Sequence, residues 1–225
     1  PLRIGIPKEV AAGESRVAAT PETVKKLRVA GLVVAVESRA GLGSHFTDDA
    51  YREAGAEITD HVGALGADIV FKVLKPTFDE IRRLRHGAVL ISLLDMCHDD
   101  GTFHALAAQG VDSFALEMIP RLSRAQTMDV LSSQSNIAGY RAVLEAARLY
   151  GRFFPMMMTS AGSAKPARVY VLGAGVAGLQ AIATARRLGA QVWAYDVRPE
   201  VKEQVLSLGA KFVEFDLGES GSGTG

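Results

Sequence analysis

The 225-residue sequence lacks three features that would each point to a different class of protein. Its single cysteine, Cys97, excludes an internal disulfide framework and suits a reducing compartment. No apolar run reaches the roughly 18 residues that a membrane-spanning helix needs. The 25 basic residues balance 25 acidic ones, so no excess charge attracts nucleic acid or an acidic membrane surface. The opening PLRIGIPKEV is strand-like, and we expect no signal peptide there.

The segment from Arg168 to Arg198 is the most informative stretch of the chain; it reads RVYVLGAGVAGLQAIATARRLGAQVWAYDVR. A β-branched strand runs into a G-x-G-x-x-G turn, a helical pattern follows, and a second strand ends on an acid. This arrangement is typical of a dinucleotide-binding βαβ unit. In such a unit the first glycine permits the tight turn, the second leaves room for a pyrophosphate, and the third allows close packing of helix and strand. The residues predicted to bind the cofactor here are Gly173, Ala174, Gly175, Val176 and Gly178.

Asp196 stands eighteen residues after Gly178, where a carboxylate hydrogen-bonds the adenosine ribose. A 2′-phosphate would meet like charge there, so Asp196 favours NAD over NADP. Arg198 complicates this reading, because a nearby arginine can accept a 2′-phosphate. We favour NAD, since Asp196 ends the strand while Val197 and Arg198 lie beyond it; these three residues complete the predicted cofactor site.

Strand-like and helix-like runs alternate through the first 120 residues, and Thr20, Thr47 and Thr77 are predicted helix caps. This alternation predicts a mostly parallel sheet covered on both faces. The expected strands are Arg3–Ile6, Val33–Glu37, Ile69–Val73, Val89–Leu93 and Ser113–Glu117.

The predicted fold class is therefore α/β, with two doubly wound parallel-sheet (Rossmann-like) domains. Residues 1–136 form an N-terminal α/β domain, and residues 137–166 form a linking helix, Ile137–Tyr150, followed by an irregular exposed linker. Residues 167–225 form the beginning of the NAD-binding domain. Only 27 residues follow Arg198, so this second domain is expected to be truncated.

The densest polar stretch, residues 121–136, offers guanidinium, carboxylate, amide and hydroxyl groups. An ion pair of Arg121 or Arg124 with Asp129 could fix its shape, and Gln126 and Ser132 could then meet an amide such as a nicotinamide carboxamide. The alternative is a solvated connection whose serines cap the next helix. Composition leaves both readings open.

Two other polar groups are weaker candidates for a site. The run Asp95-Met-Cys-His-Asp-Asp100 superficially resembles a metal cluster, but adjacent ligands rarely converge on one ion, and we predict a helix start and no metal site. Arg16, Lys72 and Lys75 lie near predicted strand ends, where α/β proteins bind ligands. Taken alone, each of these three residues is better interpreted as a surface charge than as a ligand-binding group.

Three segments together resemble one known family: RIGIPKEV…ESRVAATPETVKKL, PRLSRAQTMDVLSSQSNIAGYRAV and VLGAGVAGLQAIATARRLGAQVWAYDVRPEVKEQ. They are similar to the NAD(H)-binding component (alpha subunit, domain I) of proton-translocating nicotinamide nucleotide transhydrogenase. The resemblance implies a dimer that binds NADH and passes hydride to NADP⁺ on a partner. It implies NADP(H)-binding and membrane-spanning partner subunits, and a peripheral place on the cytoplasmic or matrix face of the membrane.

The resemblance also implies roles for single residues. Arg121, Gln126 and Asp129 match a mobile catalytic loop beside the nicotinamide, in which Arg121 pairs with Asp129 and Gln126 reaches toward the opposing cofactor. Ser132 matches a residue that holds the carboxamide, and Asp196 matches the ribose ligand. Members of the family continue well past GESGSGTG, so we expect this chain to be a fragment.

Two alternatives stay open. Alanine dehydrogenases share the Pro7-Lys8-Glu9…Arg16-Val17 opening and a lysine near Lys75. They need a general acid–base histidine after the strand written ISLLDM, where this chain has Asp95, with His98 only later. A catalytically silent fragment, with a role in scaffolding, dimerisation or nucleotide binding, is the other alternative.

Overall fold

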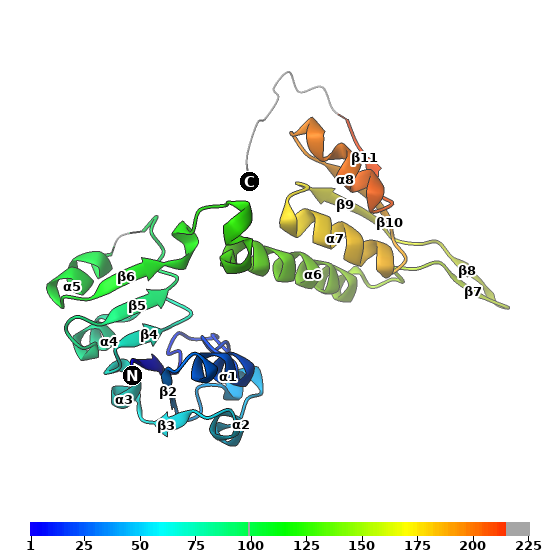
Figure 1. Cartoon of the computed structure of the whole chain (residues 1–225). Helices are drawn as coiled ribbons and strands as arrows, with labels where there is room; N and C mark the ends of the chain where they lie inside the picture. Colours follow the sequence, from blue (N-terminus) through cyan, green and yellow to red (C-terminus); the bar gives the residue numbers. More distant parts are fainter. Residues whose placement is uncertain (99, 215–225) are drawn as a thin grey trace. The chain divides into compact units, whose positions relative to one another are not determined.

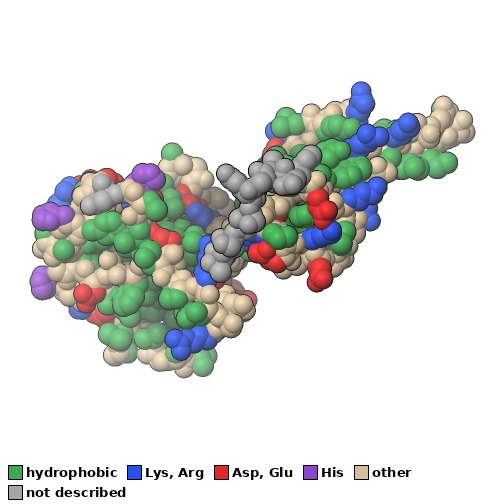
Figure 2. All heavy atoms as spheres, turned by 90° about the horizontal axis from the view of Figure 1, so that it is seen from above, with side chains coloured by type: hydrophobic (Ala, Val, Ile, Leu, Met, Phe, Trp, Pro, Cys, Tyr) green, Lys and Arg blue, Asp and Glu red, His purple; other side chains and the backbone are tan. Residues whose placement is uncertain are grey.

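The structure, a computed structural model, describes residues 1–98 and 100–214. The chain divides into two compact units, Pro1–Asp129 and Val130–Gly225, and each is described by itself. Both units alternate strands and helices, as Figure 1 shows. In the space-filling view, basic and acidic side chains both appear on each unit between apolar ones (Figure 2).

Unit 1 is built on a six-stranded parallel sheet in the order β3-β2-β1-β4-β5-β6 (Figure 1). The order reverses between β1 and β4, so the carboxyl ends of these two strands form the topological switch point, where α/β sheets bind ligands. The strands are β1 (Arg3–Ile6), β2 (Val33–Glu37), β3 (Glu57–Thr59), β4 (Ile69–Phe71), β5 (Val89–Ser92) and β6 (Asp112–Ala115). The helices are α1 (Pro21–Val29), α2 (Asp48–Glu53), α3 (His61–Leu65), α4 (Phe78–Arg83) and α5 (Thr102–Ala108), with short 3-10 turns η1 (Leu42–Ser44), η2 (Leu116–Met118) and η3 (Ser123–Met128).

The alternation of side chains along β1 explains why both faces of this sheet are covered. Ile4 and Ile6 join one buried cluster, together with Val24 of α1 and Tyr51 of α2. Gly5 points to the opposite face, where a Cβ would lie 1.8 Å from the Ala64 carbonyl oxygen of α3. Glycine at this position therefore lets α3 pack directly on the strand backbone.

The helix starts of unit 1 follow the predicted chemistry. The side chains of Thr20, Thr47 and Thr77 each accept a hydrogen bond from an N–H of the following first turn. At Thr77 the capping box is complete, because Glu80 also accepts from the Thr77 N–H. The sequence reading missed β3 and α3, since the strand Glu-Ile-Thr contains one apolar residue and α3 is only five residues long.

Unit 2 contains a three-stranded parallel sheet in the order β11-β10-β9, so the prediction of two parallel-sheet α/β domains is confirmed. Its elements are α6 (Val130–Tyr150), β7 (Met157–Thr159), β8 (Gly162–Ala164), β9 (Arg168–Leu172), α7 (Val176–Arg187), β10 (Gln191–Tyr195), η4 (Pro199–Val201), α8 (Lys202–Ser207) and β11 (Lys211–Phe212). The run Lys211–Phe215 predicts a third strand of this unit; β11 covers its first two residues, and Phe215 lies outside the described residues.

Two expectations for the segment before β9 were wrong. The linking helix begins at Val130, seven residues before the predicted Ile137, because the Ser- and Gln-rich stretch continues the helix instead of forming a loop. The stretch expected to be irregular contains an antiparallel hairpin, β7–β8, in which Met158 pairs with Ser163. Three successive methionines and a glycine at the start of β8 gave no alternating pattern to read.

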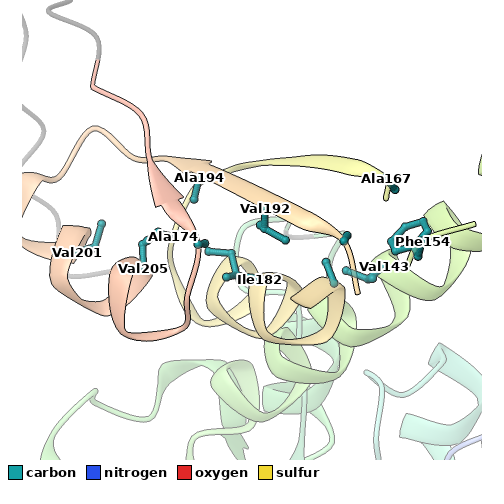
Figure 3. Packing of buried hydrophobic residues seen from close by; sticks show 12 residues of the cluster. Val143, Phe154, Ala167, Ala174, Ile182, Val192, Ala194, Val201 and Val205 are labelled. Carbon is teal, nitrogen blue, oxygen red and sulfur yellow. The ribbon is translucent and has the colours of Figure 1, made fainter. Parts of the chain in front are cut away.

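One face of the second sheet packs on helices through a cluster that includes Ile182, Val192 and Val205, shown in Figure 3. Helix α6 reaches this cluster through Val143 and crosses α7 closely, because a Cβ on Gly139 would lie 2.1 Å from the Ala177 carbonyl oxygen. Small residues at the crossing let the two helix backbones approach.

Candidate functional site

The turn between β9 and α7 has the geometry that its glycines permit. Gly173 has a φ of +92°, a conformation that favours glycine, and its N–H donates to the Tyr195 carbonyl oxygen at 2.8 Å. A Cβ on Gly178 would lie 1.8 Å from the Gly173 carbonyl oxygen, so only glycine allows the helix to begin this close to the strand. At Gly175 the nearest atom to such a Cβ is Arg198 Nη2, 4.0 Å away. The turn is therefore tightly built on its inner side and open beside Gly175.

The open side of this turn is suited to an anion. Gly175 is the N-cap of α7, whose twelve residues end at Arg187. The first N–H groups of a helix have no acceptor within the helix, and its dipole places partial positive charge there. A phosphate group is the kind of ligand that such a helix start accommodates.

Asp196 connects the ends of the two strands. Its Oδ2 accepts a hydrogen bond from the Ala174 N–H at 2.6 Å, and its Oδ1 accepts from the Arg198 N–H at 2.9 Å. The Arg198 guanidinium also donates to both oxygens, through Nε to Oδ1 at 3.0 Å and through Nη2 to Oδ2 at 3.2 Å. The structure thus joins Ala174, Asp196 and Arg198, three of the residues predicted from the sequence.

These contacts hold the carboxylate in its charged form. The side chain of Asp196 is 6% exposed and that of Arg198 is 19% exposed. The hydrogen bond from the Arg198 side chain is the largest cause that lowers the pKa of Asp196 to about 2, and the two backbone N–H donors add to it while burial opposes it. The acid is therefore ionised throughout the physiological pH range.

The residues predicted to be catalytic lie on one short segment of unit 1. Arg121 precedes the 3-10 turn η3, Gln126 lies within it, and Asp129 directly follows it. The side chains of Arg121 and Gln126 are exposed, and Asp129 is half-buried. Ser132 belongs to the first turn of α6 in unit 2. The pairing of Arg121 with Asp129 and the roles of Gln126 and Ser132 stay predictions.

An apolar groove of about 630 Å³ lies beside β6 and the segment that leads to Asp129. Phe114 and Met118 line it and are 61% and 62% exposed, and Met128 lines it next to the predicted catalytic residues. No sequence pattern predicted this groove, because its lining comes from stretches that are separate along the chain, namely residues 91–96, 103, 113–120 and 128.

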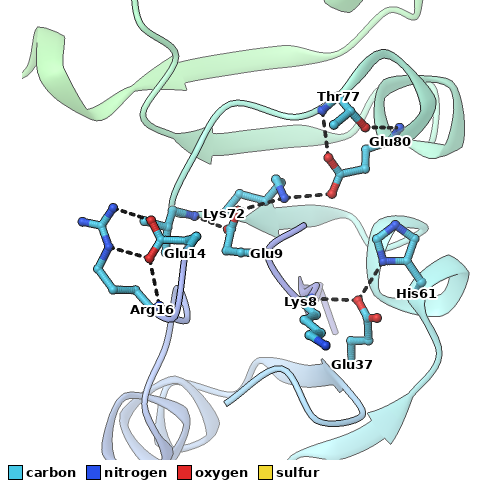
Figure 4. A network of polar contacts seen from close by, with 10 residues as sticks. Lys8, Glu9, Glu14, Arg16, Glu37, His61, Lys72, Thr77 and Glu80 are labelled. Carbon is cyan, nitrogen blue, oxygen red and sulfur yellow. Dashed lines mark hydrogen bonds and ion pairs between the residues drawn. The ribbon is translucent and has the colours of Figure 1, made fainter. Parts of the chain in front are cut away.

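A cluster of charged side chains occupies the switch point of unit 1 (Figure 4). Lys72 follows β4, and its Nζ donates to Glu9 Oε2 at 3.2 Å and to Glu80 Oε1 at 2.8 Å. All three side chains are 3% exposed or less. The reading of Lys72 as a surface charge was therefore wrong, because Glu9 follows β1 and Glu80 comes from α4, and only the fold brings them to the lysine.

Arg16 lies in the same region and is paired with Glu14, whose carboxylate accepts from its Nε at 2.8 Å and its Nη2 at 2.6 Å (Figure 4). This contact lowers the pKa of Glu14 and raises that of Arg16. Lys75 is paired with Asp100, whose pKa is lowered mainly by that lysine. Arg16, Lys72 and Lys75 thus already have acidic partners on the same unit.

The described residues offer neither a metal centre nor a membrane span. Within residues 1–98 and 100–214, no three His, Cys, Asp or Glu side chains lie close enough together to hold a metal ion. No helix in those same two ranges is both long and apolar enough to cross a membrane.

Comparison with known proteins assigns the family. The model of the alanine dehydrogenase/PNT N-terminal domain matches residues 5–138, and that of the corresponding C-terminal domain matches residues 142–221. The chain belongs to the alanine dehydrogenase/PNT family. This family contains oxidoreductases of the nicotinamide-nucleotide-binding type, and the resemblance inferred from the sequence motifs is confirmed.

Within the alanine dehydrogenase/PNT family, the transhydrogenase alpha subunits are more similar to this chain than the alanine dehydrogenases are. An NAD(P) transhydrogenase subunit alpha protein of Rhodospirillum rubrum is 52% identical over 222 residues, which cover 96% of this chain and 58% of that protein. An alanine dehydrogenase of Staphylococcus epidermidis is 32% identical over 211 residues, or 92% of this chain and 56% of that one. The chain thus spans a little over half the length of these relatives.

Among solved structures, too, a transhydrogenase is more similar to this chain than an alanine dehydrogenase is. The transhydrogenase from Sinorhizobium meliloti superimposes with a TM-score of 0.93 at 52% identity, over 94% of this chain and 64% of that chain. An L-alanine dehydrogenase superimposes with a TM-score of 0.84 at 30% identity, over 94% of this chain and 60% of that chain. Both members of the family share the Rossmann-like fold of this chain.

Proposed function

We propose that this chain is the NAD(H)-binding component of a transhydrogenase, which passes hydride between NADH and NADP⁺ held on a partner. The observation that carries the proposal is the site at the end of β10. There the ionised carboxylate of Asp196 lies beside an open glycine turn at the start of α7. The higher identity to transhydrogenase alpha subunits supports the same choice within the family.

The residues of unit 2 would bind the adenosine half of the cofactor. N–H groups at the start of α7, around Gly175 and Val176, would receive the pyrophosphate, and the backbone near Val197 would border the adenosine. Asp196 would accept hydrogen bonds from the ribose. A 2′-phosphate would bring a second negative charge next to this carboxylate, so the site favours NAD(H) over NADP(H).

The nicotinamide half would meet the segment that carries Gln126. Arg121 and Asp129 would pair to set the shape of this segment, Gln126 would reach toward the second cofactor, and Ser132 would hold the carboxamide. The bound nicotinamide supplies the hydride, so these groups control distance and orientation and exclude water. No nucleophile or metal is required from the protein for this reaction.

The assembly also belongs to the proposal. The relatives' name "subunit alpha" describes components of a multi-subunit enzyme. We infer that this chain forms a homodimer and works with NADP(H)-binding and membrane-spanning subunits. It would then lie peripherally on the inner face of the membrane, where hydride transfer is coupled to proton movement.

An alanine dehydrogenase-like activity is the second candidate, supported by the 0.84 superposition on that enzyme. The switch point of unit 1 argues against it. Arg16 is already paired with Glu14, and Lys72 with Glu9 and Glu80, so a carboxylate substrate would have to compete with these acids. Asp95 also stands in the stretch where those enzymes need a general acid–base histidine.

Calorimetric titration with NADH, and with NADPH in parallel, tests the proposal. We expect NADH to bind and NADPH to bind much more weakly. A mixture with an NADP(H)-binding transhydrogenase subunit should then transfer hydride, while alanine and NAD⁺ should give no turnover. Binding of neither nucleotide would contradict the proposal for this chain and favour a silent scaffold role. Turnover of alanine would favour the second candidate.

A further inference from the structure

The Asp196 carboxylate already uses all its hydrogen-bonding capacity. An ionised carboxylate has about four acceptor positions. At least four hydrogen bonds reach Asp196, from the N–H groups of Ala174 and Arg198 and from Nε and Nη2 of the Arg198 side chain. A ribose hydroxyl cannot be added to this arrangement without removing one of these donors.

The four donors differ in how easily they can leave. The two N–H groups belong to the backbone of the β9–α7 turn and of the segment that follows β10, so their release would distort the backbone at both strand ends. The guanidinium is carried by a flexible side chain and can move by rotation alone. The Arg198 side chain is therefore the donor that an incoming hydroxyl would displace.

We propose that Arg198 is a positioning residue that occupies two acceptor positions of Asp196 and gives them up when the adenosine ribose binds. This inference rests on the proposed function and adds the exchange step to it. The side chain need not travel far, because Arg198 Nη2 lies only 4.0 Å from the position of a Cβ on Gly175. That position borders the open side of the turn, so the released guanidinium stays next to the predicted pyrophosphate.

Because of this exchange, the ribose hydroxyl should contribute almost nothing to the binding affinity of the unaltered chain. Each hydrogen bond that the hydroxyl donates to Asp196 replaces one that Arg198 donated. If Arg198 is replaced by methionine, the stem is retained but the two side-chain donors are lost. The hydroxyl then gains a hydrogen bond to a buried carboxylate without displacing another donor.

The test compares ADP with 2′-deoxy-ADP, which differ only in this hydroxyl, on the unaltered chain and on Arg198→Met. We expect the two ligands to bind the unaltered chain within about twofold, and the hydroxyl to improve binding to Arg198→Met by about tenfold. Arg198→Lys should give an intermediate ratio, because a lysine is a single point donor. The ratio is informative because loss of a phosphate contact would weaken both ligands equally.

Arg187→Met is the matched control, since it removes the same charge from an exposed position at the far end of α7. Fluorescence of Trp193, the only tryptophan, verifies that unit 2 of each variant is folded. The same ratio for the unaltered chain and Arg198→Met, or a tenfold ratio already in the unaltered chain, would overturn the exchange. If either result came with normal NADH binding, the proposed function would stand. Failure of the unaltered chain to bind NADH would instead overturn the proposed function, and the exchange with it.

Discussion

Replacing Lys72 by methionine should destabilise unit 1 strongly, although the two side chains have similar volume. The ammonium group of Lys72 is the cation between Glu9 and Glu80, and all three side chains are almost fully buried (Figure 4). Removing one partner from a buried ionic cluster costs about 3–5 kcal/mol, because the remaining charges stay buried without compensation. Here two carboxylates would remain, so we expect the free energy of unfolding to decrease by an amount within or above that range.

The remaining backbone contacts reduce this loss only in part. Glu9 keeps the Val73 N–H at 2.6 Å and Glu80 keeps the Thr77 N–H at 2.8 Å, but these donors reach only one oxygen of each carboxylate. Adding Glu80→Gln to the Lys72→Met variant removes one buried charge. We therefore expect the double variant to recover part of the lost stability.

Urea unfolding followed by two probes provides the assay. Hydrogen–deuterium exchange of peptides from β1 and β4 reports on unit 1, while Trp193 fluorescence reports on unit 2 and should not change. Lys26→Met is the control, because Lys26 pairs with Glu22 on the surface of α1, where both side chains are more than 70% exposed. A loss below about 1 kcal/mol for Lys72→Met, as expected for a surface pair, would refute the reasoning from burial.

Four further predictions concern the proposed cofactor site. Gly178→Ala should lower the stability of unit 2 by about 1–3 kcal/mol, because its Cβ would lie 1.8 Å from the Gly173 carbonyl oxygen; an unchanged urea midpoint by Trp193 fluorescence would contradict this. The pKa of Asp196 is lowered from 3.8 to about 2, so its contribution to stability is present above about pH 4 and lost as the pH falls toward 2. Acid titration should therefore show a smaller loss over this interval in Asp196→Asn than in the unaltered chain, and equal losses would disprove it. Adding Asp196→Ala to the Arg198→Met variant should weaken NADH binding by about 1–3 kcal/mol in calorimetry, because the ribose contact is not offset there by loss of an arginine donor; unchanged affinity would remove Asp196 from the site. Gln126→Asn should slow hydride transfer to a partner subunit while the Kd for NADH is kept; equal losses in both would mean that this side chain binds the cofactor instead of positioning it.

Local sequence signals predicted most of the secondary structure. The bounds of β1 and β2 agree with those expected, since each strand is a run of mainly apolar residues ended by a polar residue or a proline. The threonine caps fixed the starts of three helices to the residue, because capping depends on groups only a few positions apart. The errors lie where local signals are weak, at the three-residue strand β3 and at the start of α6.

The candidate site also has one part that local sequence signals predicted and one part that they did not. The glycine turn and Asp196 could be predicted because the dinucleotide unit has a fixed spacing along the chain. The hydrogen-bond network that occupies the acceptor positions of Asp196 could not be predicted. The orientation of the Arg198 side chain toward Asp196 depends on the packing of both strand ends. The nicotinamide residues were assigned from a resemblance, and their positions in the structure leave those roles as predictions.

The sequence by itself therefore determined the order of strands and helices, the nucleotide motif and the family, since each depends on short-range patterns or on overall similarity. Tertiary structure alone decided which charges are buried and which are paired. Lys72 shows this most clearly, because its partners Glu9 and Glu80 are 63 and 8 residues away along the chain. Only parallel pairing of β1 with β4, and the packing of α4 beside them, brings two carboxylates to one ammonium group.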